Sequence, residues 1–273
     1  MKAKPLQNIA GNAIAVIVSL VMCIPVYLVI VNALKTRAQA SSMGVGLPTE
    51  LHWENFATVI ERGKLLQSFV NSMLYSGIST AIGVLLAAMA AFVLARNRTR
   101  ANYLLYFFII MGIAMPINFF TLTKVMQVTQ LINTRPGMIV LYAAMQIPFS
   151  VFLIYGFIGS IPRELDEAAI IDGCGPIRLF FSVILPLLTP VIVTAAVLNI
   201  LGTWNEFILP LYYLNSSANW PMTLAVYNFF GQYQSDWSLV SADILLTILP
   251  VVLIYLLGQR FILSGLTYGA VKG

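Results

Sequence analysis

The chain has 273 residues, of which 59% are hydrophobic and only 9% are charged, and its formal net charge is +5 at pH 7. So few charges cannot cover a soluble domain of this length, whereas they suit a chain that is surrounded mostly by lipid. The excess of Lys and Arg reports orientation in a membrane and does not require a nucleic acid partner.

Continuous apolar runs, each long enough to cross a bilayer, recur along the chain. They are not short segments of alternating polarity, so they exclude a porin-like barrel and predict an all-α membrane protein. We expect one transmembrane domain over residues 1–273 with six spans, at about 13–33, 69–94, 103–120, 138–158, 187–212 and 244–261.

The first apolar run is longer than a signal-peptide core, and no small-x-small cleavage site separates it from Lys35. This predicts a retained anchor. Lys and Arg gather beside the spans that we expect to end on the inner side, above all in the cluster Arg96, Arg98 and Arg100. The positive-inside rule therefore favours cytoplasmic termini.

Two outer segments are expected, at 34–66 and 214–242. The first contains an amphipathic stretch at 51–70, which indicates either a helix at the outer interface or a simple connector. The second is rich in aromatic and amide side chains, which suit either an interfacial belt or contact with a partner or ligand.

Small residues repeat every four positions in the second span, at Ser79, Gly83, Ala87 and Ala91. This spacing predicts a ridge on which another helix can pack closely.

Neither cysteine nor histidine indicates a metal site or a disulfide. Cys23 lies in a span and Cys174 in an inner loop, so we expect two free thiols. His52 has no Cys or His at metal-ligand spacing, and we therefore expect no bound metal.

The inner loop at 160–186 has the pattern of two short helices joined by a bend. Glu164, Asp166 and Glu167 suit the first turns of a helix, where the helix dipole favours acids, and Gly173 suits its end. A Gly-Pro pair then predicts a second short helix that reaches the fifth span.

One face of the first loop helix is expected to carry Leu165, Ala168, Ala169 and Asp172, by helical spacing. Short side chains edged by carboxylates can enter a groove on another protein and pair with its Arg or Lys. The alternative is an ordinary cytoplasmic loop that its acids keep soluble.

This loop resembles the EAA motif of the membrane subunits of bacterial ABC importers, with Val183 in place of the usual Ile. The matching positions are Glu167, Ala168, Ala169, Gly173, Val183, Leu185 and Pro186. More narrowly, the stretches IPRELDEAAIIDG, WNEFILPLYYL and SGLTYGAVKG resemble the carbohydrate-uptake branch, of the maltose-permease type.

The resemblance implies a type I (MetI-like) permease fold with six helices in the bacterial cytoplasmic membrane. It implies a second permease subunit, giving a heterodimer, two ABC ATPase subunits and an extracytoplasmic sugar-binding protein. The loop would then be the coupling helix seated on the ATPase, through Glu167, Ala168, Ala169, Asp172, Gly173, Leu185 and Pro186.

The chain itself lacks the phosphate-binding loop G-x-x-x-x-G-K-[ST], since Gly63 and Lys64 are followed by Leu65. We therefore expect no enzyme activity and no cofactor in this chain, with ATP and Mg²⁺ on the partner ATPases.

The substrate path is expected near Glu206, because a charge inside a span should face protein or water. With Trp204 and Asn205 it could stack on a sugar ring and bind its hydroxyls; alternatively, it makes an interhelical hydrogen bond that fixes the fifth helix. Weaker candidates are Asn118, Tyr142 and Gln146.

The stretch 215–236 resembles the outer loop by which relatives meet their binding protein. The candidates for that contact are Trp220, Tyr227, Phe230 and Tyr233.

Two other functions stay open at this point. An ABC permease for another solute would keep the coupling loop, and a proton-coupled secondary transporter could use Glu206 and Asp243 as a relay. A membrane enzyme is not indicated, because no nucleophile, base and orienting group form a set.

Overall fold

The structure is a computed structural model that describes residues 5–230 and 235–270, with side chains described for 11–230 and 235–261. The described residues form helices and no strand. The chain divides into two compact units, one of residues 1–66 and 225–249 and the other of 67–224 and 250–273. They are called unit 1 and unit 2 below, and each is treated by itself.

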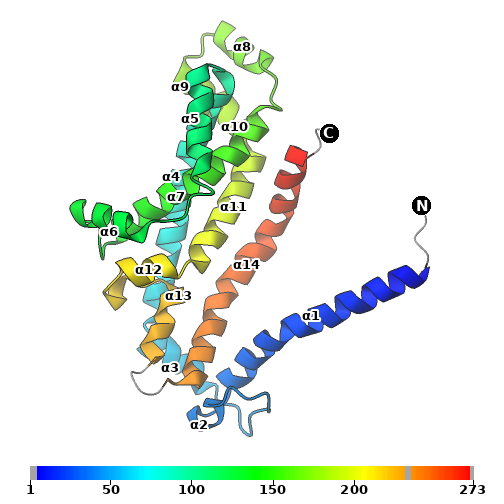
Figure 1. The fold of residues 1–273 in the computed structure, drawn as a ribbon, viewed down its shortest axis with the longest axis vertical. Coiled ribbons are helices and arrows are strands. Elements are labelled where there is room, and N and C mark those ends of the chain that lie inside the picture. Colours follow the sequence, from blue (N-terminus) through cyan, green and yellow to red (C-terminus); the bar gives the residue numbers. More distant parts are fainter. Residues whose placement is uncertain (1–4, 231–234, 271–273) are drawn as a thin grey trace. The chain divides into compact units, whose positions relative to one another are not determined.

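The helices follow one another along the chain, and the stretch 41–53 separates α2 from α3 (Figure 1). In order they are α1 (Pro5–Ala33), α2 (Arg37–Ala40), α3 (Glu54–Arg62), α4 (Leu65–Arg96), α5 (Arg100–Met111), α6 (Phe119–Val128), α7 (Arg135–Ile158), α8 (Glu164–Ile171), α9 (Pro176–Arg178), the π-helix η1 (Leu179–Ile184), α10 (Leu185–Leu187), α11 (Thr189–Asn205), α12 (Ile208–Tyr213), the 3₁₀-helix η2 (Ser217–Asn219), α13 (Met222–Ala225), the 3₁₀-helix η3 (Val226–Phe229) and α14 (Trp237–Ala270).

Four of the described helices are long and apolar enough to cross a membrane: α1, α4, α7 and α14. A fifth candidate is the pair Pro176–Leu187 and Thr189–Asn205, whose two parts meet at a bend of 76°. These segments confirm an all-α membrane protein with several spans, and they match five of the six predicted regions.

The third predicted span, 103–120, is not one helix, which corrects the expected boundaries. Helix α5 ends at Met111, and α6 begins at Phe119 after an irregular stretch that contains Gly112 and Pro116. Pro116 has no N–H to donate, and the Asn118 side chain accepts from Thr121 N at 3.0 Å and so starts a new helix. At 12 residues, α5 is about 18 Å long, shorter than a hydrocarbon core of about 30 Å.

The fifth predicted span, 187–212, is also interrupted. Helix α11 ends at Asn205 and a separate short helix, α12, follows from Ile208. At the start of the region, Pro186 and Pro190 lie on either side of the bend, where a missing N–H weakens the helical ladder.

The core of unit 2 confirms the predicted packing ridge on α4. Ser79, Ala87 and Ala91 are fully buried, and the cluster around them includes Val151 and Ile154 of α7. A Cβ added at Gly83 would lie 3.1 Å from the backbone oxygen of Ala143. The two helices therefore approach as closely as the small residues allow.

In unit 1 the predicted amphipathic stretch contains α3, and Gly63 and Lys64 separate α3 from α4. Lys64 has a φ of 51°, and a Cβ at Gly63 would meet the Phe229 ring at 2.9 Å. Asn228 Nδ2 donates to Gly63 O at 3.1 Å. The break is thus fixed by backbone geometry and by packing against η3.

The two cysteines are free, as expected. Among the described residues, no group of three or more His, Cys, Asp or Glu side chains could hold a metal ion.

Candidate functional site

The predicted coupling loop folds as two short helices joined by a bend. Helix α8 carries Glu164, Asp166 and Glu167 in its first turn and ends where Gly173 adopts a φ of 80°. Gly173 N donates to Ile170 O at 2.9 Å, and the next amide donates to Ala169 O at 2.9 Å. The left-handed glycine therefore closes the helix as the sequence predicts.

The second half of the loop starts at Pro176 and continues through α9, η1 and α10. Phe180 and Ile184 of η1 are buried in the core of unit 2, and Leu185 packs against that core. Pro186 is exposed at the following bend. Leu185 thus joins the loop to the bundle rather than presenting an open surface.

Helix α8 is anchored to the end of α4 by a largely buried ion pair. Arg96 Nε lies 2.6 Å from Asp166 Oδ2, and Arg96 Nη2 donates to Asp166 Oδ1 at 3.1 Å. Each side chain is only 13% exposed. Arg96 Nη1 also donates to Ile161 O at 3.2 Å. An ion pair this well covered, with a second hydrogen bond from the same guanidinium to Ile161 O, holds α8 close to the end of α4, so α8 and α4 should move together.

The exposure of α8 divides the predicted small-residue face. Ala168 is exposed together with Glu167 and Asp172, whereas Ala169 is only 8% exposed and belongs to the core of unit 2. Ala169 therefore packs inside this chain and is not available in this structure for close contact with another protein. The reason is tertiary packing, because helical spacing alone does not say which side of α8 the bundle covers.

Three isoleucines beside the bend are unusually exposed, and the sequence analysis did not single them out. Ile171 is 85% exposed, Ile177 75% and Ile170 59%. Figure 1 shows α8 at one end of unit 2, near α5 and α9. We call the exposed Glu167, Ala168, Ile171, Asp172 and Ile177 the coupling surface.

A small cavity of about 170 Å³ lies between α7, α11 and α12 of unit 2, the helices that precede and follow that loop. Its polar lining combines amide, hydroxyl and carboxyl groups with a phenol. It is lined by Tyr142, Met145, Gln146, Phe149, Leu198, Asn199, Gly202, Thr203, Glu206 and Leu209. Three of the predicted path residues are therefore brought together here, Tyr142, Gln146 and Glu206.

Gln146 of α7 connects this cavity to α4 and α11. Its Nε2 donates to Thr203 Oγ1 at 2.7 Å and to Ser79 Oγ at 3.3 Å. Its buried Oε1 accepts no hydrogen bond from the described residues. Asn199 Nδ2 in turn donates to Ser150 Oγ at 2.9 Å. The Oε1 of Gln146 lies on the α4 side, 3.2 Å from where a Cβ at Gly83 would be, so the Gln146 amide is held between α4, α7 and α11.

The Glu206 carboxylate makes local hydrogen bonds at the start of α12. Its Oε1 accepts from Ile208 N at 2.6 Å and from Leu209 N at 3.1 Å, so the carboxylate caps the first turn of α12. Helix N-termini favour such acids. The carboxylate lines the cavity while fixing the break between α11 and α12.

The other three path candidates lie outside the cavity. Trp204 is 1% exposed and packs edge-on to Phe69, with ring centroids 6.0 Å apart. The exposed Asn205 donates to Leu201 O at 2.8 Å, and Asn118 is the cap of α6. In this structure the Trp204 ring is not available to stack on a sugar.

The candidates for binding-protein contact are distributed over both units. In unit 2, Trp220 Nε1 donates to Leu214 O at 2.9 Å. In unit 1, the exposed rings of Tyr227 and Phe230 lie 5.5 Å apart. Tyr233 lies outside the described residues.

Sequence reasoning missed Arg96, Asn199 and Thr203 as site residues. A polar residue inside an apolar run signals Asn199 and Thr203, since such groups need a partner in lipid. The sequence shows Arg96 only as one of three arginines that flank a span. Its pairing with Asp166 depends on the fold.

Known proteins resemble this chain over nearly its whole length. It is 32% identical over 273 residues to a probable permease protein of a transport system for starch degradation products from Thermoanaerobacterium thermosulfurigenes, covering 100% of both chains. It is 33% identical over 263 residues to a melibiose, raffinose and stachyose import permease protein of Bacillus subtilis, covering 95% of each.

A solved structure shares the fold. A chain of a bacterial ABC transporter involved in the import of the acidic polysaccharide alginate superposes with a TM-score of 0.79 at 20% identity, covering 95% of this chain and 99% of that chain. The expected permease fold of ABC importers is thereby confirmed.

The family model described as the binding-protein-dependent transport system inner membrane component matches residues 83–265, more than half of the chain. The matched region includes the coupling loop, the cavity and the break at Glu206. This chain is therefore a multi-pass membrane protein of the binding-protein-dependent transport system family, a permease component of an ABC importer.

Proposed function

We propose that this chain is one of two permease subunits of an ATP-driven importer for a sugar, most naturally a di- or oligosaccharide. The observation that carries the proposal is full-length similarity to permeases whose names specify starch degradation products and melibiose, raffinose and stachyose. The second subunit is similar but distinct, and an extracytoplasmic binding protein delivers the sugar.

The energy for import comes from partner ATPases. Accumulating a solute ten-thousandfold requires about 5.5 kcal/mol. This sequence has no phosphate-binding loop, so ATP and Mg²⁺ belong to the partners and the chain is not an enzyme. The chain must then receive mechanical work through a protein contact.

The coupling surface is the proposed contact with the ATPase. Glu167 and Asp172 offer carboxylates to its Arg or Lys, and Ala168 lets the backbones approach. Ile171 and Ile177 add apolar area that is otherwise left in water. Gly173 sets the bend between the two helices.

Motion of the coupling surface reaches the bundle through two connections. Asp166 holds α8 to Arg96 at the end of α4, and the buried residues of η1 join the loop to the core. When ATP closes the ATPases, the loop and α4 should shift together and open the path outward. ATP hydrolysis then returns the subunit to its inward-facing state.

The cavity around Gln146 is proposed as this subunit's part of the sugar path. Its hydroxyl, amide and carboxyl groups are the kinds that bind sugar hydroxyls. At about 170 Å³ it is smaller than the roughly 300 Å³ and upwards of typical ligand sites. The second permease subunit would therefore complete the site.

The proposed orientation places both termini and the coupling loop in the cytoplasm. Support comes from Arg96, Arg98, Arg100, Arg163 and Arg178, all of which flank helix ends or the loop on that side. Trp220, Tyr227 and Phe230, and by sequence Tyr233, are then the candidates for contact with the binding protein outside.

Uptake by the reconstituted importer tests the proposal. The chain is purified with its co-expressed partners, placed in proteoliposomes and supplied with ATP, the binding protein and radiolabelled melibiose, maltotriose or an amino acid mixture. We expect ATP-dependent uptake of a sugar only. Amino acid uptake would indicate an ABC permease for another solute, and sugar uptake driven by a proton gradient without ATPases would indicate a secondary transporter.

A further inference from the structure

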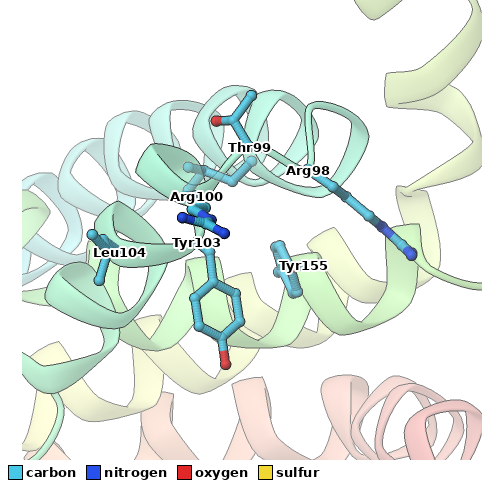
Figure 2. Close-up of a pocket in the computed structure, with 7 residues that line it drawn as sticks. Arg98, Thr99, Arg100, Tyr103, Leu104 and Tyr155 are labelled. Carbon is cyan, nitrogen blue, oxygen red and sulfur yellow. The ribbon is translucent and has the colours of Figure 1, made fainter.

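A larger cavity than the one around Gln146 lies at the end of α4, where the chain turns into α5. Its volume is about 580 Å³. Residues from the end of α4, the turn, α5 and α7 of unit 2 line it, namely Leu94, Arg98, Thr99, Arg100, Tyr103, Leu104 and Tyr155. In Figure 2 the side chains of Arg98 and Arg100 are drawn on either side of Tyr155.

The polar part of this cavity is built for an anion. Two of its seven lining residues are arginines and none is acidic. Neither Arg98 nor Arg100 forms an ion pair with any residue that the structure describes, and both are exposed. Thr99 caps α5, so the positive end of a 12-residue helix opens onto the same place.

A neighbouring cavity of about 450 Å³ extends the basic surface. Arg98 and Tyr155 line both cavities, and the second adds Arg96, Arg163 and one acid, Glu164. Arg96 is paired with Asp166, and Arg163 donates to Arg96 O at 3.3 Å. Among the described residues Arg98, Arg100 and Arg163 form no ion pair, and Arg98 and Arg100 are the two of these that line the larger cavity.

The apolar part of the cavity distinguishes a lipid from a free anion. Leu94 and Leu104 form part of the lining, and Leu104 is 68% exposed. Phe108 lies one turn later, and its side chain is 69% exposed. Met111 lies on the same face of α5. Acyl chains could lie along this stripe while a phosphate contacts the arginines.

We propose that the turn between α4 and α5 holds the headgroup of an anionic phospholipid, with Arg98 and Arg100 on its phosphate and the acyl chains along Leu104 and Phe108. Basic pockets between membrane helices bind such headgroups. Tyr103 lines the cavity, is exposed, and packs its ring edge-on to Phe107 with centroids 4.6 Å apart; such an exposed tyrosine suits the level of the headgroups. The lipid would sit beside the anchor of the coupling loop. Lipid binding goes beyond the proposed sugar transport and does not depend on which solute is carried.

Lipid retention by the intact importer complex tests this proposal. The complex is purified from bilayers of phosphatidylglycerol and phosphatidylcholine in equal amounts, and the lipids that remain bound are measured by native mass spectrometry. We expect wild type to retain phosphatidylglycerol preferentially. The double variant Arg98→Gln/Arg100→Gln should lower that preference by about fivefold per arginine, whereas Arg98→Lys/Arg100→Lys should keep most of it.

The matched control is Arg62→Gln/Lys124→Gln, which removes two exposed cations that do not line the cavity. It should leave retention unchanged. Equal retention of both lipids by wild type would overturn the proposal without requiring any variant to fold. Displacement of the lipid by 10 mM inorganic phosphate, about the concentration at which a weak anion site fills, would assign the site to a free anion. Loss of the ATPase subunits from Arg98→Gln/Arg100→Gln would assign the arginines to a protein contact.

Discussion

The coupling loop and the cavity around Gln146 lie in the same unit but differ in the burial of their polar side chains. In the loop, Glu167 and Asp172 are exposed to solvent. In the cavity, Gln146 and Asn199 are buried and already paired with hydroxyl groups of the same chain. The difference shows where a partner can bind: exposed acids are satisfied by water and stay available to another protein, whereas groups within an apolar bundle must find their hydrogen-bond partners in the fold.

The largest effect is expected at the anchor that joins α8 to α4. Asp166→Ala leaves the largely buried Arg96 without its carboxylate, which costs about 3 kcal/mol, the lower end of the range for a broken buried pair. Transport should be lost while the ATPase subunits remain competent. The measurements are the unfolding temperature of the purified complex and ATP-driven uptake.

The control for the anchor is the double variant Arg96→Ala/Asp166→Ala, which leaves no unpaired charge. It should recover part of the stability lost by Asp166→Ala but not the coupling. An Asp166→Ala protein with wild-type stability and uptake would show that the ion pair does not hold α8.

The next effect separates two adjacent alanines. Ala169→Trp should lower the free energy of unfolding by at least about 3 kcal/mol, the upper end of the usual cost of overpacking, because the core around Ala169 has no room for an indole. Ala168→Trp should fold normally and lose the ATPase subunits, since Ala168 lies on the coupling surface. Thermal unfolding and co-purification measure the two losses; equal behaviour of the two variants would contradict the division of the face.

A smaller effect is expected in the cavity. Gln146→Leu removes the donor to Thr203 and Ser79 and should cost about 1–3 kcal/mol, while raising the KM for sugar more than it lowers kcat. Asn205→Ala, which changes an exposed side chain outside the cavity, is the matched control and should leave KM unchanged. A Gln146→Leu importer with wild-type KM would remove Gln146 from the path.

The smallest effect concerns the cap of α12. Glu206→Ala leaves the amides of Ile208 and Leu209 without their acceptor and should cost about 0.5–2 kcal/mol. Glu206→Gln keeps an acceptor oxygen and should cost less. If the two variants are equally stable in chemical unfolding, the carboxylate does not act as a cap.

Local features of the fold could be predicted from the sequence. The acids at the start of α8 and the glycine at its end act within a few residues, and the predicted helix and stop are confirmed. The small residues of α4 also reveal their packing, because four-residue spacing marks one face. By contrast, Pro116 indicates a kink within 103–120, but its position alone does not say that α5 ends at Met111 and a new helix begins at Phe119.

Features that depend on distant contacts could not be predicted. Helical spacing places Ala168 and Ala169 on one face, and only the packing of η1 decides which of them is buried. Gln146 lies on α7 and its hydrogen-bond partner Thr203 lies on α11, so this pair could not be predicted from neighbouring residues in the sequence. Trp204 shows the same limit, because its ring turns into the core beside Phe69.

The central claim is that an exposed, acid-edged bend receives the motion of a partner ATPase from the cytoplasm. Site-directed crosslinking tests it most directly, in the assembled complex with Cys23 and Cys174 replaced by alanine and single cysteines introduced by Glu167→Cys or Ala169→Cys. We predict that Glu167→Cys crosslinks to an ATPase subunit, and more strongly with ATP than without, whereas Ala169→Cys does not. Labelling of Glu167→Cys by an impermeant reagent from outside the cell, or the absence of any crosslinked polypeptide, would contradict the account.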